Sequence, residues 1–138
     1  DSETAKKKLK QLIKRTSTTS AKDVINSAKS LGPVKFYHII DEELDEEFHI
    51  AVGDEAIKSD NTLLYCALIV KGSGIRIIVF AGDNAICKAG DLVKEISLKL
   101  GGSGGGDSRF GQGGGKDMSK LSDAINHAEF LIKKTVNI

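Results

Sequence analysis

The chain has 138 residues, of which 40% are hydrophobic, and a net charge of +1, which fits one globular domain with its own core. No apolar run approaches the ~20 residues that span a bilayer and no signal-peptide pattern opens the chain, so we expect no membrane contact and a cytoplasmic location. The sequence begins with Asp1 rather than Met, which indicates a fragment of a longer protein, although a processed or tagged chain would begin in the same way.

Charge is distributed unevenly along the chain. Residues 1–40 hold nine Lys/Arg and three Asp/Glu, a net charge of +6, whereas residues 41–60 hold nine acids and one lysine, a net charge of −8. Residues 61–138 hold ten basic and seven acidic side chains, a net charge of +3. A polyanion can therefore use the basic end only if the fold turns the acidic segment away from it.

Two helices are predicted before residue 34. Lys6–Arg15 forms a short basic helix, with apolar residues on one face. A second helix begins at Ser20 and ends at Gly32-Pro33, because glycine followed by proline does not continue a helix. Its predicted inward residues are Val24, Ile25, Ala28 and Leu31.

A strand and an acidic helix follow. Residues 34–40 form a β-rich apolar run. Residues 42–58 carry apolar side chains at helical spacing, so their acids would form a solvated face, with Gly53 as a candidate break. The predicted inward residues of this helix are Leu44, Phe48, Ala51, Val52 and Ala56.

The C-terminal half predicts a hairpin and two further helices. Residues 63–70 and 75–81 are β-rich and are joined by a glycine-containing turn. Leu92, Val93, Ile96 and Leu100 line a helix that Gly101 ends. The last helix covers residues 117–134, with Asp117 as its N-cap. The predicted fold class is α/β: a small mixed β-sheet packed with helices and preceded by a short helical segment.

Cysteines, histidines and acids form no recognisable catalytic or metal site. Cys66 and Cys87 lie in apolar stretches without Cys-x-x-Cys spacing, which favours buried free thiols over a disulfide. The acids of residues 41–47 include two adjacent pairs, as a metal or acid/base site would need, but they are more typical of a solvated helix face. Three histidines lack metal-ligand spacing and an evident acid partner, and we interpret them as satisfied or surface residues: His38, His49 and His127.

Residues 101–115 are the most informative segment, since they hold nine of the fifteen glycines. Glycine lacks a Cβ, so backbone N–H groups can approach a phosphate or a base edge, and the start of the last helix adds a positive dipole end. Arg109 and Lys116 would supply charge, and Phe110 either stacks on a base or anchors the core. A flexible linker is the alternative, although an ordered loop of this length inside a compact domain is more often functional.

The standard nucleotide motifs do not fit this segment. A Walker A pattern ending at Gly115-Lys116 would need glycine at Phe110 and Ser or Thr at Asp117. A dinucleotide-binding pattern starting at Gly102 meets Asp107 where glycine is required. Nucleotide hydrolysis and Rossmann-type binding are therefore not expected.

The two glycine clusters resemble a motif of the C-terminal domain of alanyl-tRNA synthetases. The matching residues are Leu100-Gly101-Gly102-Ser103-Gly104-Gly105-Gly106, a short polar spacer, and Gln112-Gly113-Gly114-Gly115 before an amphipathic last helix. The likeness covers residues 34–138 and departs at Gly111, where alanine is more usual. The same fold occurs in the substrate-binding domain of DHH-type phosphoesterases, but Asp107 stands where those proteins usually have histidine.

The resemblance implies a binding function without chemistry in this fragment. Residues 1–31 would end a helical, dimerising subdomain, and residues 32–138 would form a tRNA-binding domain of an alanine–tRNA ligase. Holding the corner of tRNA, above all tRNA-Ala, would support aminoacylation and editing by upstream domains, to which ATP and zinc would belong. The implied RNA-contacting residues are Gly101, Gly102, Gly104, Gly105, Gly106, Arg109, Gln112, Gly113, Gly114, Gly115 and Lys116.

The basic N-terminal helix is a second candidate for RNA contact or for binding a second subunit. Its cations would contact phosphates without reading sequence, and the binding would depend strongly on salt. These cations are Lys6, Lys7, Lys10, Lys14 and Arg15. Two other functions remain open. A phosphoesterase substrate-binding domain predicts upstream Asp/His metal motifs, and a dimerisation module predicts self-association with negligible RNA affinity.

Overall fold

The computed structural model describes residues 21–42, 46–72 and 74–137. The predicted basic helix Lys6–Arg15, with its candidate RNA contacts, lies outside them, as does Leu44. Within the described residues the strands form one six-stranded sheet in the order β1-β2-β3-β4-β6-β5. The strands are β1 (Lys29–Leu31), β2 (Val34–Asp41), β3 (Leu63–Lys71), β4 (Gly74–Ala81), β5 (Ser103–Gly106) and β6 (Phe110–Gly115). The β2–β3 pair is parallel and the others are antiparallel, so the predicted mixed sheet is confirmed.

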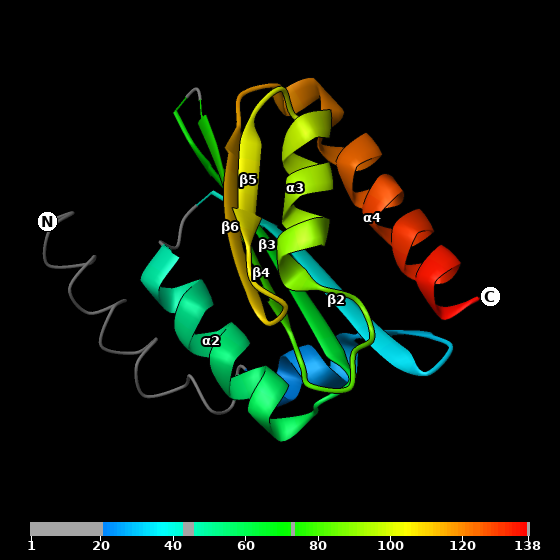
Figure 1. Cartoon of the computed structure of the whole chain (residues 1–138). Coiled ribbons are helices and arrows are strands. Elements are labelled where there is room, and N and C mark those ends of the chain that lie inside the picture. The colour runs from blue at the N-terminus through cyan, green and yellow to red at the C-terminus, as the bar shows by residue number, and fades with distance from the viewer. Residues whose placement is uncertain (1–20, 43–45, 73, 138) are drawn as a thin grey trace, which may run out of the picture.

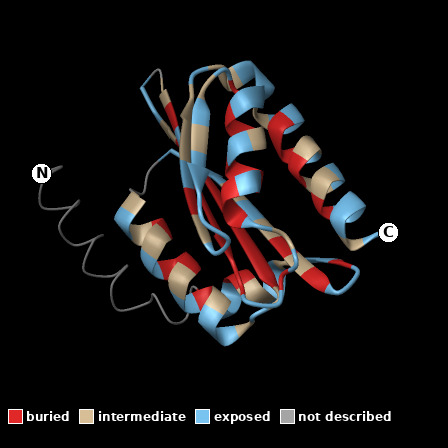
Figure 2. Ribbon diagram, in the orientation of Figure 1, coloured by how far each residue is buried: buried red, intermediate tan, exposed pale blue. Residues whose placement is uncertain are grey.

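Helices cover both faces of the sheet (Figure 1). On one face lie α3 (Ala89–Lys99) and α4 (Leu121–Val136), with a short 3-10 helix η1 (Met118–Lys120) before α4. The other face carries α2 (Glu46–Ser59), which contacts β3 and β4, and the helical residues 21–27. Two hydrophobic clusters result, one on each face, and the buried residues run along the middle strands between them (Figure 2).

The central strands explain the hydrophobic runs in the sequence. Residues 63–69 of β3 are all buried because helices cover both sides of that strand. In β4 the side chains alternate: Ile77 and Val79 join the cluster under α3 and α4, whereas Ile78 and Phe80 join the cluster under α2. The predicted hairpin of these two strands is confirmed.

The predicted helix from Ser20 to Leu31 is wrong in its second half. Helical structure ends at residue 27, and Lys29–Leu31 forms β1, which pairs with β2. Gly32-Pro33 is the two-residue turn of this hairpin, with Gly32 in the left-handed region at φ 66°. Pairing with β2 and burial of Leu31 outweigh the local helical pattern. The domain division at residue 31 stays a prediction, and the sheet itself begins at Lys29.

The acidic helix is confirmed as α2, with a different inward face from the predicted one. Ala51 is exposed, whereas His49 is completely buried. Gly53 does not break the helix. It lies where α2 packs most closely on the sheet, since a Cβ there would be 2.4 Å from Cδ2 of Phe80 and 2.9 Å from Cδ1 of Tyr65.

Candidate nucleic-acid interface

The glycine-rich segment is a β-hairpin rather than the predicted loop. β5 and β6 pair with each other, and β6 also pairs with β4, so the segment is part of the sheet and not a linker. Glycine has little preference for strands, so pairing and packing in the folded protein decide this structure.

The entry to the hairpin is fixed by the end of α3. Gly101 adopts φ 74°, its N–H donates to the Leu98 carbonyl at 3.2 Å, and the Gly102 N–H donates to the Ser97 carbonyl at 2.8 Å. This is the Schellman arrangement that follows a left-handed residue at a helix end. Gly101 therefore ends the helix, as predicted, and aims the chain into β5.

One face of the hairpin packs directly against α3. A Cβ at Gly113 would lie 2.2 Å from Oγ of Ser97, and a Cβ at Gly111 would lie 2.7 Å from Cγ1 of Val93. The hairpin and α3 can approach this closely only because residues 111 and 113 are glycines, which have no Cβ. Alanine at position 111, which is usual in the resembling family, would require Val93 to move.

The opposite face of the hairpin is almost bare backbone. Alternation along the strands places Ser103 and Gly105 of β5 beside Gly114 and Gln112 of β6 on this face. A Cβ at Gly105 would meet no atom within 4 Å. The helix α2 lies on this side of the sheet but contacts β3 and β4, so the described helices leave the hairpin's outer face open.

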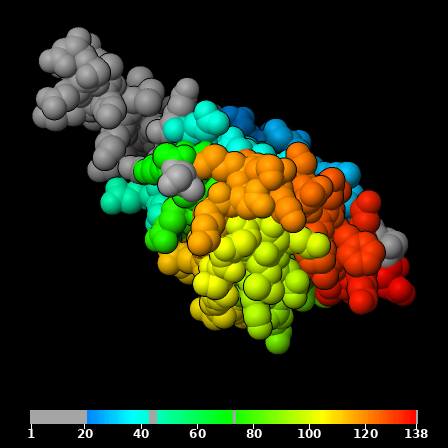
Figure 3. All heavy atoms as spheres, turned by 90° about the horizontal axis from the view of Figure 1, so that it is seen from above, coloured from blue at the N-terminus to red at the C-terminus, as the bar shows by residue number. Residues whose placement is uncertain are grey.

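A hollow of about 510 Å³ lies at the open end of this face. It is lined by Arg76, Gly101, Gly102, Ser103, Gln112, Gly113, Gly114, Gly115 and Lys116. Two of these described lining residues are positively charged and none is negative. Figure 3 shows the β3–β4 hairpin, in green, next to the yellow and gold glycine hairpin. We call the lining residues together with Gly105 the glycine surface.

Arg76 is the charged residue of this surface that sequence reasoning missed. It is the one charged side chain in the apolar run 75–81, which could have marked it, but its neighbours depend on strand register. It pairs with Gly114 across the β4–β6 ladder and is 60% exposed. Its Nε donates to Oε1 of Glu46, the first residue of α2, at 2.5 Å.

The structure separates the two predicted cations. Lys116 lines the hollow, whereas Arg109 lies at the β5–β6 turn and pairs with Asp83 at 2.6 Å. Since β6 has six residues, these positions are about 20 Å apart. Gly104 and Gly106 also lie outside the lining of the hollow, as does Gly105. The predicted set therefore divides between the base and the tip of the hairpin.

Phe110 and the last helix also differ from a phosphate- or base-binding role. Phe110 packs on Phe80, with ring centroids 4.7 Å apart, and is therefore the core anchor of the two roles considered. Asp117 caps η1 rather than α4. Its carboxylate accepts from the Ser119 N–H at 3.2 Å, so a side chain of the protein already occupies this backbone donor.

The turn at the tip of the hairpin is held by Asp107. Its carboxylate accepts from the N–H groups of Phe110 at 2.8 Å and Arg109 at 2.9 Å. These two bonds, that from Phe110 first, lower the pKa of Asp107 below its usual value. The ionised form is thus favoured in the folded protein, and the resulting stability is present above the unfolded pKa and lost as the pH falls.

Asp107→Asn is expected to lower stability at neutral pH by an amount that shrinks below about pH 4, where the wild-type carboxyl takes up its proton. The amide oxygen can still accept both bonds, so only the charge is removed. Urea unfolding of both proteins between pH 3 and pH 7 measures the difference. A difference that stays constant across this range would contradict the titration of Asp107.

His49 is a satisfied buried histidine, as expected from the sequence, but it has an acid partner that the spacing of residues did not reveal. Its Nε2 is 2.8 Å from Oδ2 of Asp41, and its Nδ1 is 2.7 Å from the Tyr65 hydroxyl. The pKa of the Tyr65 hydroxyl is raised above its usual value, mainly because the side chain is buried. His127 lies 3.4 Å from Glu95. The contacts of His49 with Asp41 and of His127 with Glu95 each join residues on different elements, so spacing along the chain cannot predict them.

Other candidate chemistry is limited in the described part of the chain. Both cysteines are free, which excludes the disulfide alternative, and burial raises the pKa of the Cys66 thiol to about 12. No group of three or more His, Cys, Asp or Glu among the described residues is arranged to hold a metal ion. None of the described helices is both long enough and apolar enough to cross a membrane.

Comparison with known proteins gives the following similarities. No family model matches the chain. It is 42% identical over 90 residues to the alanine–tRNA ligase of Nitrosopumilus maritimus, which is 65% of this chain and 10% of the ligase. The C-Ala domain of Aquifex aeolicus alanyl-tRNA synthetase has a TM-score of 0.72 at 20% identity, covering 78% of this chain and 98% of that domain.

A second group of structures shares the fold. RecJ of Thermus thermophilus in complex with Mn²⁺ has a TM-score of 0.61 at 11% identity, covering 92% of this chain and 18% of RecJ. The glycine motif implied a fold shared with the C-terminal domain of alanyl-tRNA synthetases and with DHH-type proteins such as RecJ, and both fold relationships are thus confirmed. The chain spans about a tenth of the length of the ligase it matches.

Proposed function

Since this chain is homologous to part of the alanine–tRNA ligases and has the fold of the C-Ala domain, we propose that it is the tRNA-binding C-terminal domain of such a ligase. The glycine surface carries the proposal: a bare stretch of backbone bordered by two cations and one amide side chain. In this proposal the domain holds the corner of tRNA-Ala, in the cytoplasm, while upstream domains aminoacylate and edit with ATP and zinc.

The chemistry of the surface suits RNA. Arg76 and Lys116 would contact phosphates, which position a nucleic acid without reading its sequence. The backbone around Gly105 and Gly114 lets a ribose or an unstacked base approach more closely than any side chain would allow. Gln112 is exposed on this face and has an amide that can hydrogen-bond a base edge.

Two competing functions make different predictions. A phosphoesterase substrate-binding domain shares the fold, but identity to RecJ is only 11%, and the sequence match is to a ligase. Dimerisation through the N-terminal segment concerns residues outside those the structure describes. Dimerisation can occur together with RNA binding. If dimerisation were the sole function, the glycine surface would have no ligand.

Lys116→Ala and Arg76→Ala are each expected to weaken tRNA binding severalfold at low salt and to reduce the salt dependence by about one counterion. Each change removes one phosphate contact. Gly105→Leu, which adds a side chain in open space, should weaken binding at both high and low salt because it blocks close approach. Fluorescence anisotropy of labelled tRNA-Ala at two salt concentrations measures all three.

Lys134→Ala is the matched control, since it removes one exposed lysine near the end of α4, away from the glycine surface. It should leave binding nearly unchanged. Arg109→Ala tests whether the tip of the hairpin takes part. Absence of binding at low salt, or equal affinity in every variant, would reject the glycine surface and favour a structural or dimerising role.

A further inference from the structure

We propose that Glu46 competes with RNA phosphate for Arg76, so that a carboxylate of the protein restrains binding at the glycine surface. This inference rests on the proposed RNA-binding function. It adds a residue from the acidic segment to the site, and a role for that segment beyond a solvated face.

The geometry makes Glu46 a direct competitor. Arg76 is fixed in β4, between Ile69 of β3 and Gly114 of β6, and its guanidinium borders the hollow. Glu46 is fixed in the first turn of α2 and is 31% exposed. The carboxylate thus occupies a guanidinium donor at the rim of the surface that a phosphate would use.

The strength of the pair suits a contact that can be exchanged. Ion pairs this exposed contribute about 0–1 kcal/mol. A phosphate oxygen makes a charge-assisted bond of the same kind and can replace the carboxylate. Because the RNA must displace Glu46 before it can bind Arg76, the presence of Glu46 lowers the affinity for RNA severalfold but does not prevent binding.

The position of α2 gives this competition a consequence for selectivity. The helix lies on the same side of the sheet as the open face of the hairpin, so its acids repel any polyanion that spreads beyond the hollow. A ligand gains the Arg76 contact only if its shape places a phosphate at the rim while the rest of its backbone avoids α2. An RNA corner can satisfy this condition, whereas an unstructured strand has no fixed shape that would.

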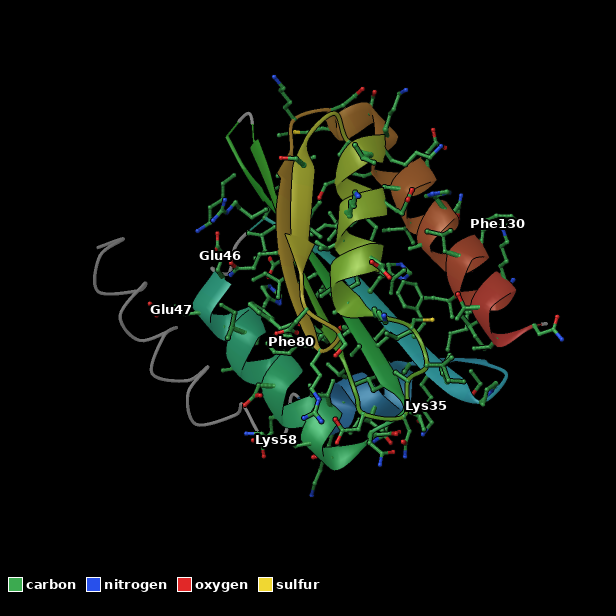
Figure 4. The ribbon with its side chains drawn as sticks, in the orientation of Figure 1. Lys35, Glu46, Glu47, Lys58, Phe80 and Phe130 are labelled. Atoms are coloured by element: carbon green, nitrogen blue, oxygen red, sulfur yellow. The ribbon has the colours of Figure 1, made fainter. Side chains whose placement is uncertain are left out.

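Glu47 provides a matched control. Glu46 lies on the side of α2 toward the sheet, whereas the neighbouring Glu47 lies on the side away from it (Figure 4). Both are in the first turn of α2, where a carboxylate interacts favourably with the positive end of the helix dipole. Of these two residues, Glu46 is the one that pairs with Arg76, so the two substitutions differ mainly in that contact.

Glu46→Gln is expected to tighten tRNA binding about twofold to fivefold, which corresponds to the loss of an exposed ion pair. Glu47→Gln should change affinity much less at physiological salt, where longer-range charge is screened. Arg76→Ala combined with Glu46→Gln should bind as weakly as Arg76→Ala alone. Binding of a single-stranded RNA of equal length should rise more than binding of tRNA, so selectivity should fall.

The outcomes separate this inference from the function on which it rests. If the wild type binds tRNA and Lys116→Ala weakens it, but Glu46→Gln and Glu47→Gln act alike, competition is rejected and RNA binding stands. Weaker binding by Glu46→Gln would mean that the carboxylate orients Arg76 for the ligand, which also rejects competition. Absence of tRNA binding by every protein, with intact circular dichroism spectra, would reject both.

Discussion

Gly102→Ala is expected to lower the free energy of unfolding by about 3 kcal/mol, the upper range for overpacking a closely packed site. A Cβ at this position would lie 1.8 Å from the carbonyl oxygen of Gly114 and 2.6 Å from its carbonyl carbon. These are backbone atoms that cannot rotate away. To relieve this clash, the two strands would have to move apart at the base of the hairpin. That movement would also strain the hydrogen bond from the Gly102 N–H to the Ser97 carbonyl. Urea unfolding followed by circular dichroism measures the loss.

Gly105→Ala is the control for this prediction. The added methyl group meets no atom within 4 Å, and Gly105 has no left-handed φ that would favour glycine. Alanine restricts the unfolded chain more than glycine does, so stability should be unchanged or rise by up to about 1 kcal/mol. If both substitutions destabilise the protein equally, the contact of Gly102 with Gly114 is not the cause.

His49→Ala is expected to cost about 4 kcal/mol of unfolding free energy. The side chain is completely buried, so its removal leaves a cavity as well as a Tyr65 hydroxyl without its imidazole partner. Tyr65→Phe removes only the hydroxyl and should cost about 1–2 kcal/mol. The chain has no tryptophan and two tyrosines, so tyrosine fluorescence reports on unfolding near this network.

His38→Ala is the matched control, because His38 is exposed on β2. Its replacement should change stability by less than about 0.5 kcal/mol. Equal losses in the His38 and His49 variants would show that the buried network contributes little, and that the histidine of α2 is replaceable.

Elements with strong local signals were predictable from the sequence. The β3–β4 hairpin follows from two β-rich runs around a glycine turn, and the end of α3 follows from Gly101 after an amphipathic helix. The two glycine strands had no such signal, since their pairing depends on β4 and their packing depends on α3. The strand β1 was missed for the same reason, because a partner formed by β2 outweighs its local helical pattern.

The candidate site divides in the same way. Gln112, Lys116 and the glycines were recognisable because they are close together in sequence. Arg76 and Glu46 lie 30 residues apart, and each reaches the glycine surface through strand register or helix placement. Spacing along the chain could not predict their contact. The partners of His49 were hidden by the same limit, since Tyr65 lies on β3 and Asp41 at the end of β2.

Seven glycines lie in the two strands of the hairpin, and they make its folding costly in conformational entropy. Each glycine in a strand is less favourable than alanine by about 0.5–1 kcal/mol. Summed over the strand glycines, this loss of folding free energy is comparable to the lower part of the about 5–15 kcal/mol that stabilises a typical domain. β5 is an edge strand, held on one side only by β6. The hairpin is therefore one end of the sheet at which local unfolding can begin, since such opening starts at weakly held elements. In the proposed function RNA binds the closed hairpin, so the affinity of the surface depends on how firmly α3 holds the hairpin in the sheet.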